Sequence, residues 1–190
     1  MTDLMNWTAE LAAVMPPPAL EQRHPVPQPA EWTAVEEALG RAIPADYTAF
    51  MAEWGPGGIG DFIRLFAPNG AFPAVRMPDA TLGPVRSYET LKAHHPQTFT
   101  MPVFPQDGGL MPFAVTDNGD YLGWIVGPGD PGSWPVAIWG DEERAAEVFD
   151  GESFGPFIVQ LVQGGIRPAA FPDDLWDDSP WAFEPRSPRP

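Results

Sequence analysis

The sequence EEALGRAIPADYTAF, residues 36–50, contains the clearest structural pattern of the chain. Apolar residues recur every three to four positions on both sides of Gly40, which predicts two amphipathic helices. Gly40 stands where a helix ends, because glycine readily takes the left-handed conformation there. Pro44 suits the first turn of the second helix, and Asp46 follows near that helix's positive end. The sequence therefore predicts two short helices joined by a tight corner.

Beyond this corner, short apolar runs alternate with turn signals, which is typical of strands. The pair Asn118-Gly119 favours a hairpin turn in which both central residues have positive φ. A last helix is predicted from its N-cap, Ser153, to about Gln163. We therefore expect an α+β fold: an N-terminal helical corner packed on a mainly antiparallel sheet of about four to six strands, with a C-terminal helix and a docked acidic tail. The predicted strands are 62–66, 110–116, 121–127, 134–139 and 145–149, and residues 85–95 are predicted as a brief helix.

Composition divides the chain into three parts. Residues 1–30 are expected to form an N-terminal helix, over 2–15, followed by a stiff proline-rich linker. Residues 31–167 form the main domain. Residues 168–190 form an acidic tail rich in tryptophan and proline. Because this tail contains five large apolar residues, we expect part of it to dock on the domain rather than remain solvated.

Charge and cysteine content exclude several classes of protein. The chain has 10 Lys and Arg against 26 Asp and Glu, a formal net charge of -16. Ordinary nucleic-acid binding is excluded, because phosphate contacts need a clustered basic surface. The absence of cysteine excludes disulfides, thiolate catalysis and cysteine-bound zinc. An acidic N-terminus and the lack of a long apolar run lead us to expect a cytoplasmic protein with no membrane partner.

Two glycine motifs look catalytic, but their surroundings argue against catalysis. Residues 55–60 spell G-x-G-x-x-G, yet they follow a predicted helix and precede a strand, the reverse of a dinucleotide site. Residues 151–155 spell G-x-S-x-G, but all three histidines precede Ser153, whereas that motif needs one after it. A small serine hydrolase using Ser153 remains a remote alternative. His94 and His95 are adjacent and do not share a helix face for metal binding. We therefore expect no enzyme activity, no cofactor and no metal.

The corner sequence, followed by Gly55, Gly57 and Gly58, resembles the SUKH superfamily. That superfamily includes Smi/Knr-type fungal cell-wall regulators and bacterial immunity proteins of polymorphic toxin systems. The segments 119–124 and 134–136 are also similar, so the resemblance covers about residues 31–166. It implies a non-enzymatic binding module, most often one that neutralises a toxin, frequently a nuclease. The motif residues, whose expected role is structural, are Leu39, Gly40, Ile43, Pro44, Asp46, Tyr47, Phe50 and Gly55.

The charge distribution is consistent with this implication. Most of the net negative charge lies in residues 107–190, and an acidic surface accelerates association with a basic partner. Our hypothesis is an immunity protein that occludes a basic toxin domain, for example a nuclease. A regulatory scaffold that binds a housekeeping partner is the alternative, and a charge that merely maintains solubility is the simpler explanation. The expected partner-binding residues are Asp141, Glu142, Glu143, Asp173, Asp174, Trp176, Asp177 and Asp178.

Overall fold

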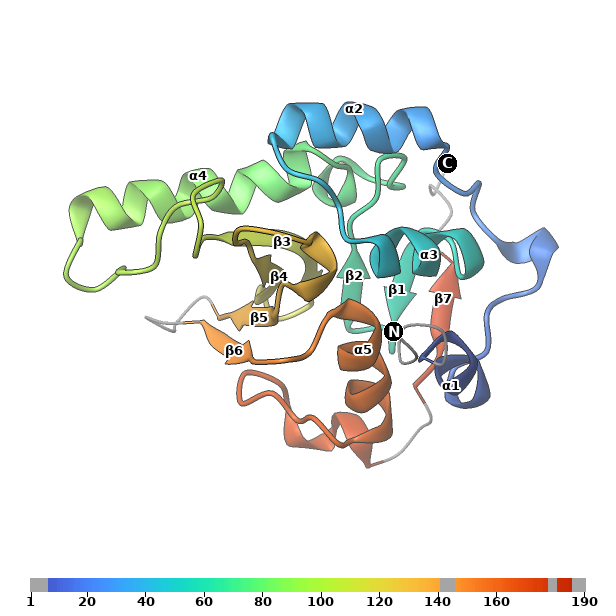
Figure 1. Cartoon of the computed structure of the whole chain (residues 1–190). Helices are drawn as coiled ribbons and strands as arrows, with labels where there is room; N and C mark the ends of the chain where they lie inside the picture. The colour runs from blue at the N-terminus through green and yellow to red at the C-terminus, as the bar shows by residue number, and fades with distance from the viewer. Residues whose placement is uncertain (1–6, 141–145, 178–180, 186–190) are drawn as a thin grey trace.

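The computed structural model describes residues 7–140, 146–177 and 181–185, and helices lie on both faces of its single sheet (Figure 1). The strands are β1 Gly57–Ile59, β2 Ile63–Leu65, β3 Leu110–Thr116, β4 Tyr121–Ile125, β5 Val136–Trp139, β6 Glu147–Phe149 and β7 Phe183–Pro185. The α-helices are α1 Trp7–Val14, α2 Pro29–Leu39, α3 Ala45–Glu53, α4 Asp79–His94 and α5 Phe154–Gln163. Within the described residues, all neighbouring strands are antiparallel, in the order β6-β5-β4-β3-β2-β1-β7. The predicted α+β fold is confirmed, with two strands, β1 and β7, that the sequence patterns do not predict.

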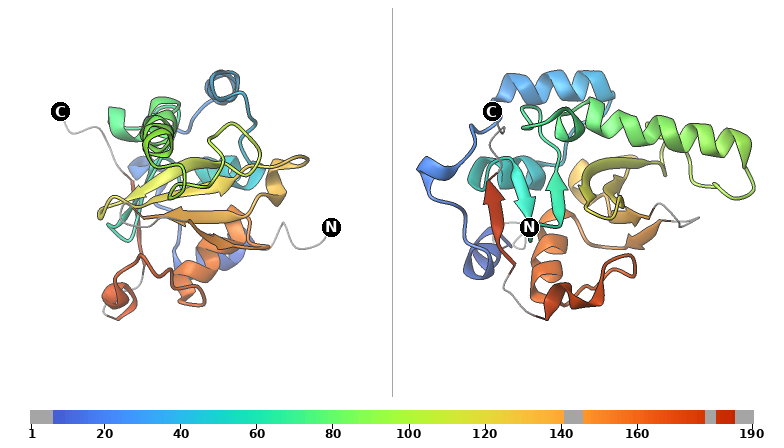
Figure 2. Two further views of the ribbon diagram at one scale, coloured as in Figure 1. Left: turned by 90° about the vertical axis from the view of Figure 1, so that its left-hand side faces the viewer. Right: turned by 180° about the vertical axis from the view of Figure 1, so that it is seen from behind.

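Two helices cover opposite faces of the sheet. Seen edge-on, the sheet lies between α4 and α5 (Figure 2). The helix α4 begins earlier than the brief helix predicted for 85–95. The prediction began too late because Gly83 and Pro84 normally break helices, whereas here both lie within α4. Pro84 is buried against the sheet, and Thr81 Oγ1 donates a hydrogen bond to the carbonyl of Pro112 (3.0 Å). These contacts hold the first half of α4 on β3.

The predicted helical corner between α2 and α3 is confirmed. Gly40 has a φ of 67°, and its N–H donates to the carbonyl of Glu36 (2.8 Å), which ends α2 as expected. The side chain of Glu36 then accepts a bond from the backbone N–H of Ile43 (2.9 Å). Pro44 is the N-cap of α3, one position earlier than predicted. The corner is therefore fixed by hydrogen bonds between residues only a few positions apart.

Tyr47 of α3 is a fully buried polar residue at the centre of the core. Its hydroxyl donates to the carbonyl of Phe66 (2.5 Å) and to that of Phe113 in β3 (3.1 Å). Its ring meets Trp124 and Phe154 edge-on, with centroids 5.1 and 4.8 Å away. Tyr47 therefore joins α3 to the sheet and to α5 at one point.

The hairpin between β3 and β4 differs from the prediction. Of the predicted pair, Gly119 alone has a positive φ, 95°, and Asn118 does not. The N–H of Gly119 donates to the carbonyl of Thr116 (3.1 Å), which is typical of a type I turn followed by a left-handed glycine. Buried Thr116 and Asp120 exchange hydrogen bonds across this turn, with Thr116 Oγ1 2.9 Å from Asp120 Oδ2. These bonds join the two residues that flank the turn.

The first helix belongs to the core rather than to a separate segment. Trp7 and Leu11 of α1 and the following Met15 are all buried. The indole of Trp54 donates to the carbonyl of Met15 (3.1 Å), and a Cβ on Gly155 would lie 2.5 Å from the ring of Trp7. The helix α1 therefore packs closely on α5.

The predicted docking of the C-terminal tail is also confirmed. The strand β7 pairs with β1, and the N–H of Gly60 donates to the carbonyl of Ala182 (2.8 Å). A Cβ on Gly60 would lie 2.5 Å from the ring of Trp181, and one on Gly57 would lie 2.3 Å from the carbonyl of Glu184. Gly57 in β1 and Gly60 just after it therefore make room for the tail.

We expect Tyr47→Phe to lower the free energy of unfolding by about 1–2 kcal/mol, because it leaves the buried carbonyl of Phe66 without its hydroxyl donor. Urea denaturation followed by tryptophan fluorescence measures the change, and an unaltered m-value indicates that the fold is kept. Tyr88→Phe is the matched control, because its hydroxyl bonds a single carbonyl, that of Met101, in a part-buried site. An equal loss in both variants would contradict the central role of Tyr47.

Candidate protein-binding surface

The acidic tail is held in place by a tryptophan. After α5, the chain forms a single-turn helix, η4 Asp173–Trp176. The indole N–H of Trp176 donates to the carbonyl of Leu161 in α5 (2.9 Å), and the guanidinium carbon of Arg167 lies 5.1 Å from its ring centroid. The rings of Phe171 and Trp181 lie 6.5 and 5.8 Å away. Trp176 therefore fixes η4 against the body of the molecule.

This attachment leaves the carboxylates of η4 in solvent. Asp173, Asp174 and Asp177 are all exposed, and the N–H of Asp177 donates to the carbonyl of Asp174 (3.1 Å). The loop between α5 and η4 also contacts β6: Glu147 Oε2 accepts a hydrogen bond from the N–H of Ala169 (2.9 Å). Acidic residues from the tail and from the end of the sheet therefore flank one loop, below the sheet in Figure 1.

The structure describes only part of the predicted partner-binding set. It places Asp173, Asp174 and Asp177 together on η4, with Trp176 half-buried beside them. That Trp176 anchors a partner stays a prediction, and in the chain alone its indole N–H is already bonded to Leu161. Asp141, Glu142, Glu143 and Asp178 lie outside the described residues.

The basic residues mostly bind backbone carbonyls rather than carboxylates. Arg41 donates twice to the carbonyl of Pro105 (3.1 and 2.6 Å), and Lys92 Nζ donates to those of Thr100 and Met101 (2.9 and 2.7 Å). Arg23 Nε and Arg76 Nε likewise donate to the carbonyls of Pro18 and Gly70. Ion pairs among the described residues include Arg41–Asp107 and Arg64–Asp117. Most of the negative charge is therefore not neutralised by a neighbouring cation, as the excess of 26 acidic over 10 basic residues requires.

Asp46 of the corner motif caps α5 from another helix. Its Oδ2 accepts the N–H of Gly155 in the first turn of α5 (3.0 Å), and its Oδ1 accepts the N–H of Tyr47 (2.9 Å). Burial raises the pKa of Asp46 above its ordinary value, although hydrogen bonds from Gly155 and the Ser153 side chain oppose this shift. The expected capping bond from Ser153 is absent: Ser153 occupies the N-cap position of α5 without bonding its backbone. Its hydroxyl contacts a carboxylate instead.

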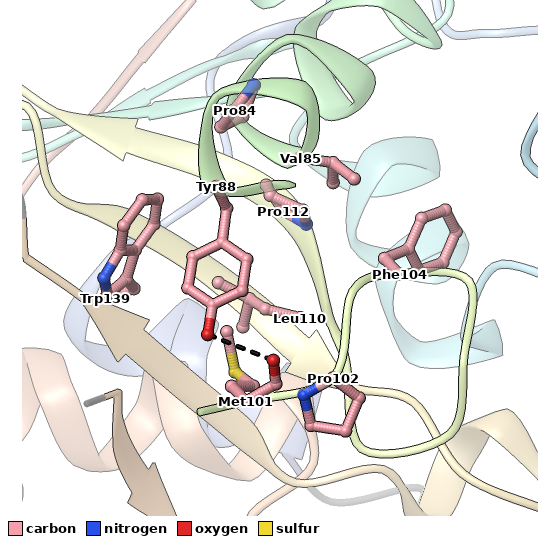
Figure 3. Close-up of a pocket in the computed structure, with 9 residues that line it drawn as sticks. All are labelled: Pro84, Val85, Tyr88, Met101, Pro102, Phe104, Leu110, Pro112 and Trp139. Atoms are coloured by element: carbon pink, nitrogen blue, oxygen red, sulfur yellow. Dashed lines mark hydrogen bonds between the residues drawn. The ribbon is translucent and has the colours of Figure 1, made fainter. Parts of the chain in front are cut away.

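A small apolar hollow lies between α4, β3, β5 and the segment before β3 (Figure 3). Its volume is about 260 Å³ with the open solvent at its mouth included. The hydroxyl of Tyr88 donates to the carbonyl of Met101 (3.1 Å), and burial raises the pKa of this phenol. The lining offers no other titratable group. It consists of Pro84, Val85, Tyr88, Met101, Pro102, Phe104, Leu110, Pro112 and Trp139.

The described residues contain no group of three or more His, Asp or Glu side chains placed to hold a metal ion. None of their helices has both the length and the apolar character needed to span a membrane.

Comparison with protein-family models gives a match over residues 27–160, to the model described as the SMI1 / KNR4 family (SUKH-1). The chain belongs to the SMI1/KNR4 family. The match confirms the resemblance read from the corner sequence. It includes α2, α3 and β1 to β6, whereas η4 and β7 lie beyond it. A search of the curated proteins found no match.

We expect Asp46→Asn to lower the free energy of unfolding, because the amide supplies only one acceptor oxygen at the start of α5. The raised pKa of Asp46 means that the native state binds its proton more tightly than the unfolded chain does. The contribution of Asp46 to stability is therefore complete below about pH 4 and declines as the pH rises through its native pKa. The difference between wild type and variant should be greater at pH 4 than at pH 7.

Chemical denaturation at both pH values measures this difference. The matched control is Glu37→Gln, at an exposed position of α2, which should leave stability within about 0.5 kcal/mol of wild type at each pH. A difference that grows from pH 4 to pH 7 would contradict the direction assigned to Asp46.

Proposed function

We propose that this SMI1/KNR4-family chain is a non-enzymatic protein-binding module, an immunity protein that neutralises a basic toxin domain by occlusion. The observation that carries the proposal is the acidic surface that the chain's own cations leave largely unneutralised. Family membership supports a protein-binding role. In this proposal the protein acts in the cytoplasm and needs no cofactor.

The electrostatics favour a basic protein partner. Arg41 pairs with Asp107, Lys92 binds backbone carbonyls, and Arg167 stacks on the ring of Trp176, so none of these three cations forms an ion pair with Asp173, Asp174 or Asp177. An acidic surface of this kind raises the association rate with a basic partner by roughly 10- to 1000-fold at low salt. A nuclease presents a basic surface to phosphate, so an acidic protein can occupy the same surface.

The rigidity of η4 also supports occlusion. Trp176 is bonded to α5 and stacked near Phe171, so Asp173 and Asp174 project from a backbone that is already ordered. Less conformational entropy is then lost on binding than with an unstructured acidic tail. A charged surface held in this way suits a tight inhibitor.

A regulatory scaffold for a housekeeping protein is the second candidate, because the SMI1/KNR4 match is compatible with either role. Co-expression with the product of the adjacent reading frame distinguishes the two. If that product arrests growth alone and the chain restores growth, the immunity role is supported. The two proteins should then co-purify at low salt and separate more readily at high salt. A harmless neighbour that does not co-purify would contradict the immunity proposal.

Reversing the charge of η4 should slow this association. We expect Asp173→Lys with Asp174→Lys to lower the association rate with the co-purified partner by about tenfold at low salt and to flatten its salt dependence. Stopped-flow fluorescence at two salt concentrations measures both quantities. The matched control is Glu37→Lys with Glu53→Lys, the same charge change at exposed positions of α2 and α3. Equal effects of the two double variants would remove η4 from the interface.

A further inference from the structure

The strand β6 is one end of the sheet. In the sheet order, β6 pairs with β5 on one side, and within the described residues no strand lies on its other side. The opposite end is formed by the tail strand β7, across the molecule (Figure 1). An open strand edge is a template for another strand unless its charges or shape prevent pairing.

The backbone of Val148 faces outward from this edge. The N–H of Val136 in β5 points toward the β6 side, because it donates to the carbonyl of Glu152 (3.0 Å). Backbone groups alternate in direction along a strand, so Val136 and Ile138 both bond toward β6, opposite Phe149 and Glu147. Val148, between these two, must then direct its N–H and C=O away from the sheet. One donor and one acceptor are thus available for an incoming strand.

The side chains of β6 divide between the two faces. Val148 lies opposite Ala137, on the face covered by α4, and is 42% exposed because α4 packs mainly over β3. On the other face, Phe149 packs on Phe157 of α5, with ring centroids 5.0 Å apart, and Glu147 bonds the loop after α5. The edge is therefore anchored on one face and exposes an apolar side chain on the other.

The charge around this edge selects its occupant. Glu147 lies in β6, and Asp150 and Glu152 lie within three residues of the end of β6. In a second copy of this chain the same carboxylates would approach them, and like charges across a strand pair are destabilising. A segment bearing Lys or Arg would instead place cations beside these carboxylates, with an apolar residue against Val148.

We propose that β6 is a strand-addition site for a basic segment of a partner protein in which apolar residues alternate with Lys or Arg. The inference rests on the proposed function, because it specifies how the basic partner binds. Backbone hydrogen bonds at Val148 supply affinity, and the carboxylates of Glu147 and Asp150 supply specificity. Strand addition next to the loop that Glu147 contacts also brings the partner toward η4.

The test uses the full chain and a short, end-blocked peptide of alternating lysine and valine with a fluorescent label. We expect saturable binding by anisotropy, no binding of the matching glutamate–valine peptide, and loss of binding when alternate peptide nitrogens are methylated. Val148→Pro should weaken binding about tenfold, because it removes the outward N–H. Proline at an outward edge position is compatible with the sheet, and a circular dichroism melt checks this. Val148→Thr, which retains the N–H, is the matched control.

The outcomes separate this inference from the proposed function. Weak binding to Val148→Pro and to the methylated peptide, with normal binding to Val148→Thr, supports strand addition. Binding that survives Val148→Pro and methylation but is lost with Asp173→Lys and Asp174→Lys overturns strand addition while leaving an acidic binding surface. Absence of binding to the wild-type chain overturns the inference. If Val148→Pro does not fold, the methylated peptide decides alone.

Discussion

Two neighbouring side chains at the start of α3, Asp46 and Tyr47, connect this helix to α5 and to the sheet. Asp46 accepts the N–H of Gly155, and the next residue, Tyr47, donates to carbonyls of Phe66 and Phe113. All of these groups are buried, so separating any pair would leave a polar group without a partner or water. Helix α3 therefore cannot shift relative to the sheet or to α5 without breaking several such bonds at once. Asp46 and Tyr47 of the corner sequence therefore form a structural junction between α3, the sheet and α5.

The acidic surface follows from how the chain uses its few cations. Arg41 and Lys92 join loops by bonding to carbonyl oxygens, where a guanidinium or ammonium group provides several donors at once. These cations keep their charge, but the 10 basic residues of the chain cannot balance its 26 carboxylates. The remaining repulsion opposes compactness. The aromatic attachment of Trp176 to α5 then determines where part of this charge is displayed. Arg41, Lys92 and Trp176 thus contribute both to the stability of the fold and to the distribution of charge on its surface.

Local signals were sufficient to predict the helical corner, because Gly40 and its hydrogen bond to Glu36 depend on residues close in sequence. The exposure of Asp173 and Asp174 could also be expected, since carboxylates without a cation partner are rarely buried. The strand β1 could not, because its glycines resemble a loop until β7 arrives from the end of the chain. The capping of α5 by Asp46 could not be predicted either, since Asp46 and Gly155 are 109 residues apart in the sequence. Contacts of this range depend on packing, which no short pattern encodes.

The close fit between β1 and the tail has an evolutionary consequence. Gly57 and Gly60 lie so near Glu184 and Trp181 that a side chain at either glycine and an intact tail exclude each other. A lineage that lost the tail could place valine or isoleucine at position 57 in β1, as ordinary strands do, whereas the positive φ of Gly60 (63°) favours glycine there with or without the tail. A lineage that retained the tail must retain both glycines. Substitutions at Gly57 and in the tail are therefore expected to covary, although more than a hundred positions separate them in the sequence.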